Sequence, residues 1–363
     1  MTYKRRQFLM LVAGSFGGLG IAKCARQTQS DRTLSTTASA IAPEETPISP
    51  APKGLTAPVR GDVRIVAISD LNSSYGSTSY EPEVERAIAL IPDWQPDLVL
   101  CGGDMIASQK LSLSKAQIQA MWEAFDRHVA APLRQANIPF GFTIGNHDGS
   151  GALAQGKFVF ASDRQLAAAY WNDPAHNPAL QFVDRAEFPF YYTFRQNDIF
   201  YLVWDASTSI ISAQQLAWVE KSLASPNAKQ AKMRIAIGHL PLYAVAVGRD
   251  NAGNFLANAE PLRSLLERYQ VHTYISGHHH AYFPGKKGKL ELLYAGAIGS
   301  GPRQLLNSNL PPRKTLTVVD INLDKLLTIY TTYDMKTTTV IDITTLPSAI
   351  VGPNGKVVRR DLV

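Results

Sequence analysis

The chain has 363 residues, enough for one large domain or two ordinary ones, and its hydrophobic content of 45% excludes a chain that is disordered throughout. The formal net charge of +6 falls to +2 once the first 24 residues, which hold four basic side chains and no acidic one, are set aside. A charge so close to neutral makes nucleic acid an unlikely partner, because grooves that follow a phosphate backbone are normally basic.

The first 24 residues are typical of an export signal. A basic head that contains Arg5 and Arg6 precedes an apolar stretch at residues 8–22, which is shorter than the roughly 20 residues that span a bilayer. The paired arginines, followed by Phe8-Leu9, resemble a twin-arginine signal; ordinary secretion and a cytosolic tail are the alternatives. We expect contact with the export machinery, a periplasmic or other extracytoplasmic location, and no transmembrane span after signal removal.

The two cysteines are not expected to form a disulfide. Cys24 closes the export signal, and Lys23 stands where a lipid-attachment site would have a small residue, so a lipid anchor at Cys24 is the less favoured outcome. Cys101 lies in the apolar run "DLVLCGGD" and is predicted to be a buried thiol. A bond between a leader residue and a core strand is not favoured.

Residues 25–60 are predicted to be a flexible linker. They are rich in Ser, Thr, Ala and Pro and show little apolar periodicity, so they cannot bury enough apolar surface to offset the loss of chain entropy. The folded domain is predicted at residues 61–346, followed by a C-terminal tail at 347–363.

Within the folded domain, buried strands alternate with amphipathic helices. The predicted strands that end in polar residues are 63–70, 97–104, 138–148, 233–241 and 271–280, and the predicted helices are 81–91 and 114–136. A hairpin at 191–207 turns at Asn197-Asp198, and further strands are predicted within 315–333 and 337–346. Residues 149–189 are predicted to be an inserted loop or lid. These elements predict an α/β fold, a sandwich of two mixed sheets.

Five strands each deliver Asp, Asn or His at the carboxyl end, where sites form in sheets with helical crossovers. The residues concerned are Asp70, Asp104, Asn146, His147, His239, His278 and His280. On an extended chain His278 and His280 share a face while His279 points away. Each residue alone is as readily a cap, a turn residue or a hydrogen-bonded core histidine. Together they indicate a metal site.

The series resembles the signature of the calcineurin-like metallophosphoesterases. The matching strings are "SDLN" (69–72), "GGD" (102–104), "GNHD" (145–148), "GHLP" (238–241) and "GHHH" (277–280). The resemblance implies a four-layer αββα sandwich, makes residues 61–346 the catalytic domain, and implies two divalent metal ions (Mn, Fe, Zn or Co) at the strand ends.

The resemblance also implies a role for each matching residue. Asp104 would bridge the two metals; Asn146, His239 and His278 would complete the second site, and Asp70 and His280 the first. His147 would face the substrate phosphate and donate a proton to the leaving oxygen, with Asp148 orienting it. A hydroxide that bridges the metals would attack phosphorus.

One position departs from the family pattern. Asn72 stands where most members have a metal-binding histidine, and Ala107 stands where the purple acid phosphatase branch has a tyrosine. We therefore expect the first metal, next to Asn72, to be held more loosely.

Substrate contacts are less well marked. Tyr75, Arg249 and Arg303 could each reach a phosphate, and Arg303 is preferred because "AGAIGSGPR" places it in a glycine-rich loop after a strand.

These features predict an exported phosphoesterase that acts on small phosphate monoesters or diesters. A nuclease or nucleotide hydrolase of the same fold is the first alternative. A catalytically impaired protein that binds phosphate or metal is the second, which Asn72 favours and the intact His147 disfavours.

Overall fold

The computed structural model describes residues 49–363. The predicted export signal, Cys24 and most of the predicted linker lie outside this range. Within it, no helix is long and apolar enough to cross a membrane. Cys101 is a free, buried thiol, as predicted.

One mixed sheet has six strands in the order β15-β14-β13-β1-β2-β3. They are β1 (Val63–Ile68), β2 (Leu98–Cys101), β3 (Phe140–Phe142), β13 (Thr315–Asn322), β14 (Leu327–Asp334) and β15 (Thr339–Val340). Strands β1, β2 and β3 are parallel, so their carboxyl ends lie at one edge. All six residues of β1 are buried, five of them apolar and the sixth Arg64.

The other sheet has nine strands in the order β16-β17-β11-β12-β10-β9-β8-β7-β6. They are β6 (Phe182–Glu187), β7 (Tyr191–Gln196), β8 (Ile199–Val203), β9 (Met233–Ile237), β10 (Thr273–Ser276), β11 (Tyr282–Lys287), β12 (Leu290–Ala295), β16 (Ala349–Gly352) and β17 (Gly355–Arg359). Strands β8, β9, β10 and β12 are parallel. The β7–β8 hairpin turns at Asn197-Asp198, as predicted, and both residues have left-handed φ angles.

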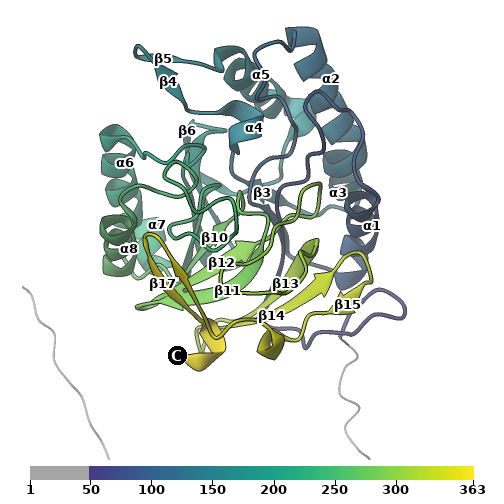
Figure 1. The fold of residues 1–363 in the computed structure, drawn as a ribbon, viewed down its shortest axis with the longest axis vertical. Coiled ribbons are helices and arrows are strands. Elements are labelled where there is room, and N and C mark those ends of the chain that lie inside the picture. The colour runs from purple at the N-terminus through teal and green to yellow at the C-terminus, as the bar shows by residue number, and fades with distance from the viewer. Residues whose placement is uncertain (1–48) are drawn as a thin grey trace, which may run out of the picture. The chain divides into compact units, whose positions relative to one another are not determined.

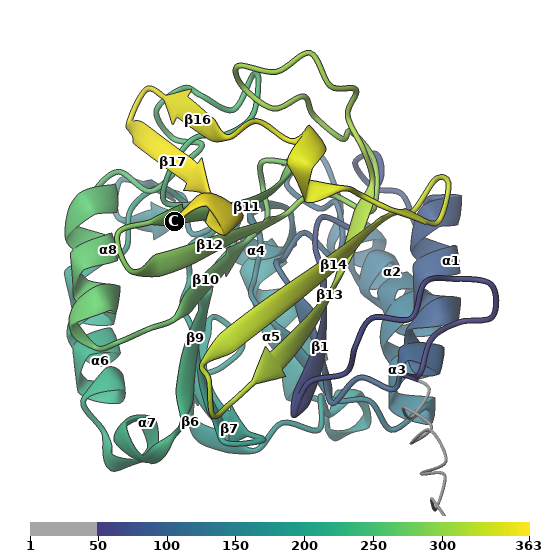
Figure 2. The same ribbon diagram turned by 90° about the horizontal axis from the view of Figure 1, so that it is seen from below.

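Helices cover the outer face of each sheet. Helices α1 (Pro82–Leu90), α2 (Lys115–Phe125) and α3 (Ala131–Gln135) lie on one side, and α6 (Ala213–Leu223), α7 (Pro226–Gln230) and α8 (Ala259–Arg268) on the other (Figure 1). Figure 2 shows the two sheets between these helical layers. The four-layer αββα sandwich is thus confirmed.

The segment 149–189 is more ordered than a loop. It contains α5 (Ala161–Asn172), the β4–β5 hairpin (Leu153–Ala154 and Lys157–Phe158) and β6. Trp171 of α5 stacks on Phe142 with ring centroids 3.8 Å apart, and Tyr170 stacks on Trp122 of α2 at 4.9 Å. These buried aromatic contacts fix the helix on the core, which a loop could not do.

The ends of the folded unit also differ from the prediction. Residues 49–60 are not all linker, because the main-chain oxygens of Pro50 and Pro58 accept hydrogen bonds from the fully buried Arg64 at 2.9 and 2.8 Å. Residues 349–359 are not a tail, because β16 and β17 extend the nine-stranded sheet through β11. The strand predicted within 337–346 is only β15, followed by a short 3₁₀ turn at Ile343–Thr345.

Candidate metal centre

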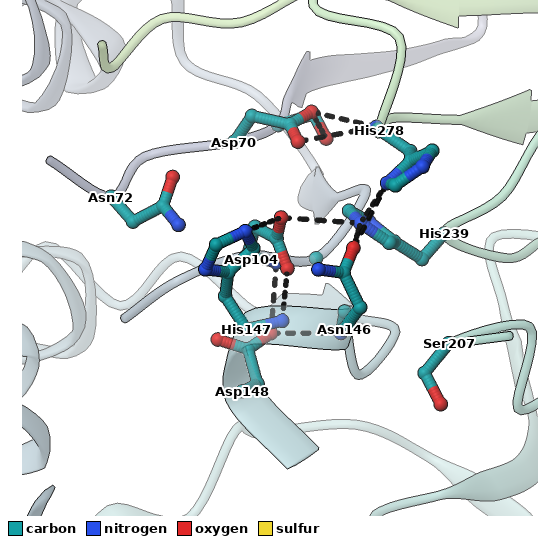
Figure 3. Close-up of polar contacts among 12 residues, drawn as sticks. Asp70, Asn72, Asp104, Asn146, His147, Asp148, Ser207, His239 and His278 are labelled. Carbon is teal, nitrogen blue, oxygen red and sulfur yellow. Dashed lines mark hydrogen bonds and ion pairs between the residues drawn. The ribbon is translucent and has the colours of Figure 1, made fainter. Parts of the chain in front are cut away.

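The seven residues singled out at strand ends come from both sheets. Asp70 follows β1, Asp104 follows β2, and Asn146 and His147 begin α4 (Asn146–Gly149) after β3. His239 follows β9, and His278 and His280 follow β10. Figure 3 shows the side chains of Asp70, Asp104, Asn146, His239 and His278 pointing toward one another.

Two groups of donor atoms share one carboxylate. Asp104, His239 and His278 form the first group, Asp70, Asp104 and His280 the second, and within each the donor atoms lie within 4.8 Å of one another. All but His280 are buried. Because Asp104 belongs to both groups, its carboxylate can bridge two cations.

The orientations of two histidines show that the centre suits cations. His239 Nδ1 lies 2.8 Å from the Gly102 oxygen, and His280 Nδ1 lies 2.9 Å from the Gly301 oxygen, so each Nδ1–H donates there. In the neutral rings the Nε2 lone pairs then face carboxylates: His239 Nε2 lies 3.2 Å from Asp104 Oδ2, and His280 Nε2 lies 3.2 Å from Asp70 Oδ1. A lone pair and a carboxylate oxygen this close need a positive charge between them, which a bound cation or a proton on the ring supplies.

Asn146 completes the first group with an oxygen. Its Oδ1 lies 2.9 Å from both His239 Nε2 and His278 Nδ1. Its Nδ2 donates to Gln109 Oε1 at 2.7 Å, which turns the amide oxygen toward the imidazoles. Gln109 was not identified from the sequence, because no motif marks it and only the folded chain brings it to Asn146.

The backbone at four ligand candidates is left-handed. The φ angles are 53° at Asp70, 56° at Asp104, 62° at His278 and 51° at His280. Such conformations cost about 1–3 kcal/mol each outside glycine and persist where the surrounding structure enforces them.

The strand ends correct the prediction that His278 and His280 share a face of an extended chain. His278 and His280 do not converge as alternate residues of a strand, because β10 ends at Ser276. Asp70 and Asn72 also lie beyond their strand, because β1 ends at Ile68. In both cases the turns after the strands aim the side chains.

Two motif glycines are required by close packing. A Cβ on Gly145 would collide with the carboxylate of Asp104, and one on Gly277 would collide with Ser69 Oγ and the carboxylate of Asp70. The glycine that precedes each ligand segment therefore lets another part of the centre approach its backbone.

Electrostatic interactions in the centre favour positive charge. Burial lowers the pKa of His239, but the charge of Asp104 and their hydrogen bond raise it above its ordinary value overall. Burial raises the pKa of Asp104, but His239 and His147 lower it well below its usual range. His278 keeps a lowered pKa, through burial and the neighbouring His239, and so remains neutral and able to bind a metal.

His147 lies beside the two groups rather than in either. Its Nε2 is 3.9 Å from Asp104 Oδ2, and its ring stacks on the half-exposed Tyr75 with centroids 5.1 Å apart. Its buried Nδ1 has no hydrogen-bond partner among residues 49–363. Burial lowers its pKa, against the opposing charge of Asp104.

Asp148 does not orient His147, contrary to the prediction. Its Oδ2 accepts from the backbone N–H groups of Asp104 and Gly145, both at 2.8 Å. Its Oδ1 accepts from those of Met105 and Ile106 at 2.7 and 2.9 Å. Asp148 therefore joins the two loops that carry Asp104 and Asn146.

Two further residues have defined places. Asn72 is buried to one side of the cluster (Figure 3), and its Nδ2 donates to the Ile106 oxygen at 3.3 Å. Its amide oxygen is therefore the atom left to face a cation.

His279 accepts from the Val245 N–H at 3.2 Å and contacts the Asn254 oxygen at 3.0 Å through Nε2. Its full burial lowers its pKa to about 3, so it is a neutral structural residue.

A cleft of about 850 Å³ is lined by residues from Gly151 onward, just after the end of α4 in the chain. It lies between the insertion, including Phe158 and Arg164, and the segment after β8, including Asp205 and Ile210. Arg164 joins the two sides, through an ion pair with Asp205 at 2.9 Å and a hydrogen bond to the Gly149 oxygen at 2.8 Å. The insertion thus borders a cleft next to the segment that carries Asn146 and His147.

A family model described as calcineurin-like phosphoesterase matches residues 63–282. Among solved structures, a purple acid phosphatase from yellow lupin (Lupinus luteus) seeds matches with a TM-score of 0.55 and 18% identity, over 77% of this chain and 52% of that one. The chain thus spans about half the length of the lupin protein.

GAP50, the anchor in the inner membrane complex of Plasmodium, matches with a TM-score of 0.48 and 13% identity, over 78% of this chain and 91% of that one. A comparison with curated proteins gives no match. At these identities the likeness to solved structures concerns the fold alone.

Proposed function

The chain belongs to the calcineurin-like phosphoesterase family, whose members hydrolyse phosphoester bonds, and on that premise we propose that it is a two-metal hydrolase of small phosphate monoesters or diesters. The observation that carries the proposal is the carboxylate of Asp104, shared by two groups of donor atoms. A scaffold that only bound phosphate would not need a carboxylate shared by two groups of metal-binding side chains.

Two sets of residues would each bind one cation. Asp104, Asn146, His239 and His278 would hold one cation, and Asp70, Asp104, His280 and the Asn72 amide oxygen the other. Two divalent cations (Mn, Fe, Zn or Co) would supply Lewis acidity and activate water for attack on phosphorus.

His147 would donate the proton that the leaving oxygen needs. Its Nε2 lies next to Asp104, and its side chain is 16% exposed, so a substrate can reach it. An anionic phosphoryl group beside the ring would raise its pKa, which burial lowers, and so favour the imidazolium form.

A panel of chromogenic monoesters and diesters, assayed with each metal, tests the proposal. Turnover should require added metal and stop with a chelator. Asp104→Asn should lose nearly all turnover and both metals, whereas His147→Ala should lose about 10²-fold in turnover and keep both. Asp126→Asn is the matched control, since Asp126 pairs with Arg134 at the end of α2. Absence of metal-dependent turnover on every ester would contradict hydrolysis.

Export through the twin-arginine route is part of the proposal and rests on residues 1–24 of the sequence. Arg5→Lys with Arg6→Lys should leave the precursor in the cytoplasm, because that route distinguishes guanidinium from ammonium groups. A general secretory signal needs only positive charge and would survive the change. Normal export of the double variant would contradict the twin-arginine route and favour ordinary secretion.

A further inference from the structure

Two arginines beside the metal centre have no acidic partner. Arg249 lies in the segment after β9, and Arg303 in the segment after β12. In the part of the chain that the structure describes, neither guanidinium forms an ion pair, and the buried Nε of each lacks a hydrogen-bond partner. Both side chains are only partly buried, but a buried N–H is normally hydrogen-bonded, so the two unpartnered Nε atoms point to an anionic ligand.

Each arginine is one contact away from a metal-ligand histidine. The backbone N–H of Arg303 donates to the backbone oxygen of His280 at 2.8 Å. Arg249 Nη1 donates to Asn254 Oδ1 at 3.0 Å, and the same oxygen lies 3.3 Å from His278 Nε2. Because His278 faces the centre with Nδ1, Asn254 and Arg249 lie beyond the opposite edge of its ring. The two arginines are therefore carried by segments next to His280 and His278.

The two arginine segments are fixed to each other. The Val247 N–H donates to the Gln304 oxygen at 2.9 Å, and the Leu306 N–H donates to the Val245 oxygen at 2.8 Å. An antiparallel bridge joins Ala246 and Leu305 between them. The two backbone segments that carry the arginines are thus held in place before a ligand arrives, which lowers the entropy cost of binding.

The two guanidinium groups are also close enough to repel each other. Arg303 Nη1 lies 3.0 Å from where a Cβ on Gly248 would stand, next to Arg249 in the chain. Burial, with the positive charge of Arg249, lowers the pKa of Arg303. A bound dianion would remove this repulsion.

We propose that Arg249 and Arg303 bind a second phosphoryl group of the substrate, so that the enzyme acts on small molecules that carry two phosphates. The inference rests on the proposed phosphoesterase function. A phosphate monoester carries close to two negative charges and three terminal oxygens, which match two planar guanidinium forks. A carboxylate, with one charge and two oxygens, is matched by one fork.

The test compares bisphosphates of straight-chain diols, from propanediol to hexanediol, with the monophosphates of the same diols. The wild type should show a kcat/KM about a hundredfold higher for the best bisphosphate than for its monophosphate. Arg249→Gln and Arg303→Gln should each reduce that ratio about tenfold, and the double variant should abolish it. Arg249→Lys and Arg303→Lys should keep part of the preference for the bisphosphate, because lysine retains the charge but lacks the planar guanidinium group.

Arg195→Gln is the matched control. Arg195 lies beside the β7–β8 turn, which precedes the parallel strand β8 and so lies at the opposite end from the ligands. The substitution Arg195→Gln removes the same charge and should leave the ratio of kcat/KM between bisphosphate and monophosphate unchanged. Equal losses on bisphosphate and monophosphate in the double variant would overturn the inference, because the arginines would then hold the reacting phosphoryl group.

Calorimetry on metal-depleted protein separates this inference from the proposed hydrolysis. The bisphosphate should bind more tightly than the monophosphate, and the double Arg→Gln variant should lose that preference. That preference, together with no turnover in the assays with added metal, would leave the inference standing and contradict the proposed hydrolysis. Equal affinity for the two compounds in the wild type would overturn the inference.

Discussion

At the scale of single residues, the centre depends on side chains that bind no cation themselves. Gln109 fixes the amide of Asn146 through a hydrogen bond at 2.7 Å, and Asp148 joins two ligand loops through four backbone N–H groups. Such supporting contacts usually change metal affinity by about 10–100-fold when removed. The family motif marks Asp148 but not Gln109.

Gln109→Ala should weaken the cation site formed by Asn146, His239 and His278 about tenfold, because the Asn146 amide loses the contact that orients its oxygen. Gln109→Glu keeps an oxygen that accepts from Asn146 Nδ2 and should restore affinity. Calorimetric titration with Mn checks both. The control is Gln119→Ala, which removes an exposed contact to Glu123 on α2. Equal affinity in Gln109→Ala and Gln119→Ala would mean that Gln109 has no positioning role.

Asn72 should make the site of Asp70 and His280 the weaker one. An amide oxygen is a neutral and weaker donor than imidazole toward Zn or Fe(II), and Ala107 supplies no tyrosinate. Full activity should therefore need added metal, and no purple charge-transfer band should appear with iron. Asn72→His should tighten this site and shift its preference toward metals that favour nitrogen. Two equally tight sites in the wild type, unchanged by the substitution, would place Asn72 outside the centre.

At the scale of helices and strands, the sequence predicted those elements whose pattern is local. Strands β1, β2, β9 and β10 are apolar runs that end in polar residues, so both their places and their ligands could be read in order. Helix α5 was missed because its alanine-rich sequence shows weak periodicity and its position depends on Trp171 stacking against Phe142, far away in the chain. The left-handed turns at the ligands were missed for the same reason, since contacts from other strands impose them.

The last turn of the chain, which follows β17, is held to β12 by a partly buried ion pair. Arg360 Nη2 lies 2.8 Å from Glu291 Oε1, and Thr328 and Tyr330 donate to Glu291 Oε2 at 2.8 and 2.9 Å. Burial alone would raise the pKa of Glu291, but the charges of Arg360 and His272 and the hydrogen bonds from Thr328 and Arg360 lower it overall. Since the folded-state pKa lies below the unfolded value, the stabilisation is complete above the unfolded pKa and is lost as pH falls through the folded one.

Glu291→Gln should therefore lower the free energy of unfolding at neutral pH by about 1.5–3 kcal/mol, a typical value for hydrogen bonds to a charged group. The difference in Tm between variant and wild type should shrink as the pH falls below the unfolded pKa of a glutamate, about 4.3, and vanish below the lower folded-state pKa. Thermal unfolding measured across this pH range checks the prediction. A Tm difference that does not change with pH would show that the charge of Glu291 is not what stabilises the contact.

At the scale of the whole molecule, the folded unit begins before the predicted domain boundary. One compact unit spans Ile48–Val363, whereas composition placed the start of the domain at residue 61. The proline-rich segment gives no periodic signal, because its order comes from its main-chain oxygens rather than from apolar side chains. The buried guanidinium of Arg64 needs those oxygens, since its ion pair with Asp320 at 2.9 Å satisfies only part of its donors.

A chain that begins at residue 48 should therefore unfold at the same temperature as the mature protein, whereas one that begins at residue 61 should be less stable. The shorter chain loses Ser49, Pro50 and Pro58, which accept three hydrogen bonds from Arg64. Each lost bond to a buried charge costs about 1.5–3 kcal/mol, so the fall in Tm should be several degrees or more. Tyr333 also loses its acceptor, the Thr56 oxygen, at 2.6 Å.

Arg64→Met in both chains separates the contribution of Arg64 from that of Tyr333. The Tm difference between the two chains should shrink, because a methionine has no donors to satisfy. Equal Tm values for the two chains with Arg64 intact would show that residues 48–60 add nothing to the fold.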